Sequence, residues 1–157
     1  MDEQQPQPTF NIEKIYIKDL SLEIPHAPEV FLTSEQPQVE VQLHNEGGLI
    51  GDGLYQVVLT VTLTAKAGDK TLFLVEAAQA GIFQIRNLPE ADTEPLLSTA
   101  CPNILFPYVR EVVSDVISRA GFPPVYLAPV NFEAMYMQRL QEAQAQGQAA
   151  PKIEIAH

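Results

Sequence analysis

The most regular stretch of the chain is residues 55–64, which read Tyr-Gln-Val-Val-Leu-Thr-Val-Thr-Leu-Thr. Its odd-numbered positions are all apolar, and its even-numbered positions are mostly glutamine or threonine. Because successive side chains of a strand point to opposite faces, this alternation predicts a β-strand with one buried face. The turn sequence Ala67-Gly68-Asp69 follows, so residues 71–85 are expected to return as an antiparallel strand.

Two further strands are expected earlier in the chain. Residues 39–43 alternate valine or leucine with glutamate or glutamine, and residues 10–24 form a longer alternating run whose odd positions become acidic towards the end. The glycines at positions 47, 48, 51 and 53 predict a flexible loop, and no Lys-Ser or Lys-Thr pair directly follows them as in a phosphate-binding loop. Short connections between alternating strands favour a four-stranded antiparallel sheet.

The chain after residue 102 favours helices. Asn103 is expected to cap a first helix with Pro107 in its first turn, and this helix is expected to end at Gly121. Asn131 is expected to cap a second helix, and the sequence becomes rich in glutamine and alanine after Glu142. One apolar stripe of the first helix consists of Val109, Val112, Val113, Val116 and Ile117. The predicted fold class is therefore α+β, with two main helices packed on one face of the sheet.

The length of 157 residues indicates one domain. We expect a disordered lead-in over residues 1–9, a single domain over residues 10–142, and a flexible Gln/Ala-rich tail over residues 143–157.

The balance of acidic and basic residues argues against certain classes of binding partner. Nine Lys and Arg residues against 20 Asp and Glu residues give a net charge of −11, which argues against binding to nucleic acid or to anionic membranes. The first residues lack the positive start and apolar run of a signal peptide, and no apolar stretch reaches the ~20 residues of a spanning helix. We therefore expect a cytoplasmic protein that does not insert into a membrane.

The residues that usually carry catalysis or bind metals form no convincing group. The histidines at positions 26, 44 and 157 are not spaced as metal ligands, so no metal site, no cofactor and no catalytic residue is predicted. Cys101 is the single cysteine and cannot form an internal disulfide. A small hydrolase with Cys101 as nucleophile and His26 or His44 as base stays open as an alternative, although a free cysteine is more often a buried packing residue.

Four residues of the expected sheet suggest a docking surface. Asp19 and Glu23 are four positions apart on one strand and share a face, and Leu74 and Glu76 share a face of another strand. This surface is either a solvated outer face of the sheet or a docking patch for a basic partner with Leu74 as its apolar anchor.

The chain also carries more apolar residues than one small core requires. They lie in the second expected strand, in the glycine-rich segment and in the second helix: Val39, Val41, Leu43, Leu49, Ile50, Met135, Tyr136, Met137 and Leu140. Such a surplus indicates either oligomerisation or a groove for other chains, and methionines suit a groove that accepts varied sequences. The alternative is an ordinary hydrophobic core.

Four separate stretches resemble one family. Residues 101–111, Cys-Pro-Asn-Ile-Leu-Phe-Pro-Tyr-Val-Arg-Glu, and residues 127–132, Leu-Ala-Pro-Val-Asn-Phe, closely resemble the SecB family of protein-export chaperones. Residues 15–21, Ile-Tyr-Ile-Lys-Asp-Leu-Ser, and residues 81–83, Gly-Ile-Phe, are similar to the same family in the same order. The resemblance extends from about residue 10 to residue 140.

The resemblance implies an ATP-independent chaperone that keeps precursor proteins unfolded in the cytoplasm and delivers them to the SecA motor. It also implies a homotetramer, assembled as a dimer of dimers, with the first long helix at the tetramer interface. The implied SecA-binding residues are Asp19, Glu23, Leu74 and Glu76, and any zinc would belong to SecA. The implied client-binding residues are Phe31, Val39, Val41, Leu43, Tyr136 and Met137. An acidic adaptor that binds no unfolded chains is the main alternative.

Overall fold

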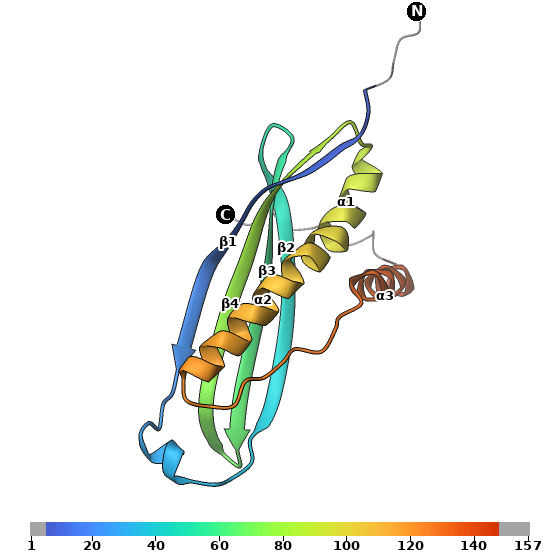
Figure 1. The fold of residues 1–157 in the computed structure, drawn as a ribbon. Helices are drawn as coiled ribbons and strands as arrows, with labels where there is room; N and C mark the ends of the chain where they lie inside the picture. The colour runs from blue at the N-terminus through green and yellow to red at the C-terminus, as the bar shows by residue number, and fades with distance from the viewer. Residues whose placement is uncertain (1–5, 148–157) are drawn as a thin grey trace, which may run out of the picture.

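The computed structural model describes residues 6–147 as one twisted antiparallel sheet with helices on one of its faces (Figure 1). The strands are β1 (Thr9–Glu23), β2 (Gln38–Gly51), β3 (Leu54–Ala67) and β4 (Lys70–Arg86), in the spatial order β1-β4-β3-β2. The helices are the short 3₁₀ helix η1 (Glu29–Leu32) and the α-helices α1 (Glu90–Ser98), α2 (Ala100–Arg119) and α3 (Phe132–Ala145). The predicted α+β class and four-stranded antiparallel sheet are confirmed.

The hydrophobic core lies between the β3–β4 hairpin and α2, which crosses it diagonally (Figure 1). The hairpin turns at Gly68, whose φ of 62° lies in the left-handed region that glycine tolerates. Alternate residues of β3 are fully buried on the helix side, as the alternation predicted: Val57, Leu59, Val61 and Leu63. Leu105, Val109 and Val113 of α2 are equally buried against them. We call this side of the sheet the helix side and the opposite side the outer face.

The glycine-rich loop predicted after residue 43 is wrong. Strand β2 continues through Gly47 and Gly48, which pair with Val57 and Gln56 of β3. A ladder uses only backbone groups, so glycine can continue a strand when a long partner is present. Only Gly53 of this group has a positive φ, of 67°, and it forms the tight turn to β3. The Arg86 side chain covers that turn and donates hydrogen bonds to the carboxylate and the carbonyl of Asp52.

Strand β1 carries two β-bulges, at Glu13 and at Lys18, where its register with β4 shifts. Each bulge adds one residue and exchanges the faces of the residues that follow it. Simple alternation placed Ile15 and Ile17 on the acidic face, and this is wrong because they lie opposite Gly81 and Gln79 on the helix side. The second bulge restores the alternation, so that Asp19 returns to the outer face.

The beginning of the helical region also differs from the prediction. Helix α1 was not expected, and α2 begins at Ala100, so Asn103 lies inside the helix and is not its cap. The hydroxyl of Thr99 donates to the carbonyl of Pro95, and the N–H of Asn103 donates to the carbonyl of Thr99. Helix α1 therefore runs almost directly into α2, which begins without a side-chain cap.

The remaining helix boundaries agree with the prediction. Helix α2 ends at Arg119, which pairs with Asp115 at 2.9 Å, and Gly121 follows with a φ of 94°. The Asn131 side chain accepts a hydrogen bond from the N–H of Ala134 and caps α3. Residues 1–5 of the expected lead-in and residues 148–157 of the expected tail lie outside the described residues. Within residues 6–147, no helix has the length and apolarity needed to cross a membrane.

Candidate functional site

The strand register brings Asp19, Glu23, Leu74 and Glu76 together on the outer face, and we call these four residues the acidic patch. Glu23 lies opposite Leu74, and Ser21 lies opposite Glu76 on the same pair of strands, β1 and β4. Asp19, Glu23 and Glu76 are exposed, and Leu74 is half-buried among them. Within residues 6–147 none of the three carboxylates forms an ion pair, and Glu76 accepts only a hydrogen bond from Thr62. Their negative charge is therefore available to a partner.

A small apolar cluster supports this face from one side. Tyr16 packs on Val58, Ala78 and Ala80, and its hydroxyl donates a hydrogen bond to the side-chain carbonyl of Gln56. Val58 and Ala80 are almost fully buried, although none of the helices within residues 6–147 covers this side of the sheet. Alternation placed Tyr16 on the helix side, and only the bulge at Glu13 brings it to the outer face. The acidic patch therefore lies beside a packed apolar cluster on the outer face of the sheet.

On the helix side, α2 packs on β4 and β3 and leaves part of the edge strand β2 uncovered. Val39, Val41 and Leu43 all point to this side, because they pair with the buried residues of β3. We call these three residues the apolar stripe. Val39 and Val41 are 40% and 42% exposed, and Leu43 is half-buried. The stripe is an accessible apolar surface that continues the core to the edge of the sheet.

One end of the stripe opens into a cavity of about 560 Å³. Three aromatic rings line it in a row, with centroids 5.2 Å apart for Phe31 and Phe122 and 4.6 Å apart for Phe122 and Phe73. Phe31 is 48% exposed, and Val39 lines the same cavity. We call this space the aromatic cavity. Phe122 carries no signal of this role in the sequence, because the row is assembled from segments far apart in the chain.

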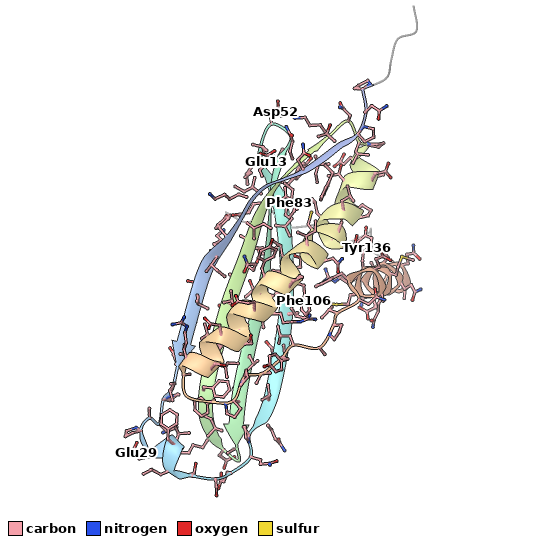
Figure 2. All side chains as sticks on the ribbon, viewed as in Figure 1. Glu13, Glu29, Asp52, Phe83, Phe106 and Tyr136 are labelled. Carbon is pink, nitrogen blue, oxygen red and sulfur yellow. The ribbon has the colours of Figure 1, made fainter. Side chains whose placement is uncertain are left out.

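The other end of the stripe reaches α3. Leu43 and Tyr136 line a small pocket that Phe132 and Met135 complete. Figure 2 shows Tyr136 on the side of α3 that faces the rest of the fold. Burial, and after it the Glu94 carboxylate, raise the pKa of Tyr136, so its hydroxyl remains a hydrogen-bond donor.

Five of the six residues expected to bind clients therefore follow one path from the aromatic cavity to α3: Phe31, Val39, Val41, Leu43 and Tyr136. The sixth, Met137, is 54% exposed and lines neither of the two pockets.

The geometry gives no support to a cysteine nucleophile. Cys101 is fully buried, and burial raises its pKa to about 12, so the reactive thiolate does not form near neutral pH. His44 lies on the outer face of β2, where its ring is hydrogen-bonded to Glu46 at 3.0 Å, and His26 lies in an exposed turn. No group of metal-binding side chains forms among residues 6–147. The structure thus presents two accessible surfaces on opposite sides of one sheet, one acidic and one apolar.

Comparisons with known proteins agree with this architecture. Residues 3–143 match the family described as "Preprotein translocase subunit SecB". The "Protein-export protein SecB" of Dechloromonas aromatica is 67% identical over 140 residues, which cover 89% of this chain and 92% of that protein. The protein of the same description from Chromobacterium violaceum is 61% identical over 145 residues, which cover 92% and 97% of the two chains.

A solved structure shares the fold at much lower sequence identity. It is a SecB-like chaperone of Mycobacterium tuberculosis in complex with a ChAD peptide from the HigA1 antitoxin, with a TM-score of 0.65 and 17% identity over 78% of this chain and 91% of that one. The match to the family over residues 3–143, together with relatives of 67% and 61% identity, shows that this chain belongs to the SecB family.

Proposed function

We propose that the chain is an ATP-independent holdase that keeps precursor proteins unfolded in the cytoplasm and delivers them to SecA. The observation that carries this proposal is the uncovered path formed by the aromatic cavity and the apolar stripe. Unfolded precursors expose apolar side chains, and an open apolar groove can bind them without reading their sequence. The relatives of the same family, described as protein-export proteins, support the same role.

The chemistry of the groove suits reversible capture. Its exposed residues are Val39 and Val41 on the helix side of the edge strand β2 and Phe31 of η1, and they offer apolar area without charge. Each contact is individually weak, and several copies that hold one client raise the overall affinity through effective concentration. Binding of the unfolded chain then slows its folding because the pool of free unfolded chains is reduced.

The outer face is the proposed docking surface for SecA. Asp19, Glu23 and Glu76 provide unpaired negative charge, and Leu74 provides a half-buried apolar contact between them. Complementary charge accelerates association and selects a basic partner. Because this face lies on the opposite side of the sheet from the groove, a client and SecA can be bound at the same time.

A homotetramer, assembled as a dimer of dimers, is the proposed assembly. The helix side of the edge strand β1 exposes a row of large apolar residues, and α2 adds an exposed tyrosine: Ile12, Ile17, Leu20, Leu22 and Tyr108. An apolar surface of this kind fits a second copy of the chain. Four copies would carry a net charge of 4 × −11 = −44, which favours solubility.

The test of the two surfaces is a charge reversal on one of them. In the variant Asp19→Lys with Glu76→Lys, SecA binding measured by calorimetry is expected to be lost, while a slowly folding precursor is still kept unfolded. The control variant, Asp69→Lys with Glu90→Lys, makes the same change of charge at two exposed sites away from the outer face and is expected to bind SecA normally. Unchanged SecA affinity in the first variant would count against the assignment of the outer face.

A further inference from the structure

The lining of the aromatic cavity contains one acidic side chain among apolar and uncharged groups. The uncharged polar residues of this lining are Thr33, Ser34 and Gln36. Glu35 is its only acidic residue, and no lysine, arginine or histidine of residues 6–147 lines the cavity. Glu35 is exposed and forms no ion pair with another described residue. The cavity therefore combines apolar walls with one negative charge that nothing in the described part of the chain balances.

The row of aromatic rings in this cavity leads from the core to the solvent. Phe73 is 2% exposed, Phe122 is half-buried, and Phe31 at the end of the row is 48% exposed. Gly121 leaves space for the Phe31 ring, because a Cβ at this position would lie only 3.1 Å from the ring. About half of the surface of Phe31 thus stays open to a ligand. The negative face of an aromatic ring attracts cations.

A lysine or arginine side chain matches both the rings and the carboxylate. Its methylene stem can cover apolar surface while its charged head remains near the solvent, where it meets Glu35. An acidic side chain would be repelled by Glu35, and an apolar one would leave the carboxylate without a partner. The net charge of −11 further favours a basic ligand.

The position of Glu35 also links this charge to the apolar stripe. Glu35 lies in the segment between η1 and β2, four residues before Val39. Val39 lines the same cavity and is the first residue of the stripe. A client segment that lies along the stripe can therefore place one of its side chains in the cavity beside Glu35.

We propose that Glu35 is a specificity-determining residue of the client groove and that the aromatic cavity receives a lysine or arginine side chain of the client. The neighbouring apolar residues of the same client segment bind the apolar stripe. This inference rests on the proposed function, because it names the side chain that one part of the client groove selects. An exposed ion pair and one cation–π contact each contribute modestly, so the expected preference for a basic side chain is roughly three- to tenfold in Kd.

The test compares labelled peptides of one alternating apolar sequence that differ at a single position, which is lysine or norleucine. Norleucine keeps the apolar stem of lysine and removes its charge. The variant Glu35→Gln removes the carboxylate from the cavity, and the control Glu29→Gln removes an exposed carboxylate of η1 that does not line it. The parent and Glu29→Gln are expected to bind the lysine peptide roughly three- to tenfold more tightly than the norleucine peptide. In Glu35→Gln this preference is expected to be lost.

A second variant, Phe31→Leu, tests whether the basic side chain lies in the cavity. It keeps an apolar side chain without the aromatic ring, so it should weaken binding of the lysine peptide more than binding of the norleucine peptide. Equal weakening of both peptides would overturn the placement in the cavity. An equal preference for lysine in Glu35→Gln and Glu29→Gln would overturn the role of Glu35 and leave the proposed function intact. If neither the peptides nor a denatured precursor bind the parent, the proposed function fails and the inference fails with it.

Discussion

The apolar stripe leads to a quantitative prediction for the double variant Val39→Thr with Val41→Thr. Threonine keeps the shape and the β-branching of valine, so the strand is expected to persist while a hydroxyl replaces one methyl group in each residue. Complete burial of a valine side chain contributes about 1.5–3 kcal/mol, so burial of the exposed 40% and 42% contributes about 1 kcal/mol at each position. Removal of one of the two methyl groups loses about half of this at each position, about 1 kcal/mol in total, which weakens client binding about fivefold.

The assay is an equilibrium titration with a fluorescently labelled unfolded precursor. The control is Gln42→Thr, which introduces the same residue on the same strand but on the outer side. A client affinity within twofold of the parent, in a variant that melts at nearly the parental temperature, would refute the assignment of the stripe. An equal loss in Gln42→Thr would refute it as well.

Three predictions concern the scaffold. Gly81→Ala should lower the free energy of unfolding, measured in urea, by about 1–3 kcal/mol, because the new Cβ would lie 2.8 Å from the buried Phe83 ring. The control Gly51→Ala should be nearly neutral, because the nearest atom to its new Cβ lies 3.6 Å away. The thiol of Cys101 ordinarily has a pKa of 9.0 and retains its proton to about 12 in the fold. Stability should therefore fall as pH rises from 9, by about 1.4 kcal/mol at pH 10, and in Cys101→Ala this part of the alkaline decline should disappear from pH-dependent urea titrations. Asn131→Ala should lower the free energy of unfolding by about 1 kcal/mol in the same urea assay, because the cap of α3 is removed. Asn131→Asp should keep most of the parental stability, because aspartate also caps helices. Equal stability of these two variants would contradict the role of the cap.

The parts of the fold that the sequence predicts are those with local signals. The alternation of residues 55–64 defined β3, the turn at Gly68 defined the hairpin, and Asn131 defined the start of α3. The placement of Asp19 on the outer face agrees with simple alternation for a particular reason. The bulges at Glu13 and Lys18 each exchange the two faces, so their effects cancel before Asp19 is reached.

The parts that were missed depend on contacts between distant segments. Helix α1 contains Pro95, which interrupts the helical pattern and hides it from a periodicity search. Strand β2 continues through Gly47 and Gly48 because β3 offers a partner along its whole length. The aromatic row of Phe31, Phe122 and Phe73 comes from three separate segments and has no signature in any one of them.

The central claim is that this chain assembles and captures unfolded polypeptides along the uncovered helix side of its sheet. The most direct test is light scattering coupled to size-exclusion chromatography, with and without a denatured, slowly folding precursor. We expect a free species near 69 kDa, four times the chain mass of 17.3 kDa, that gains mass only in the presence of the unfolded client. A stable monomer that ignores unfolded chains would contradict the account and would favour an acidic adaptor that uses the outer face alone.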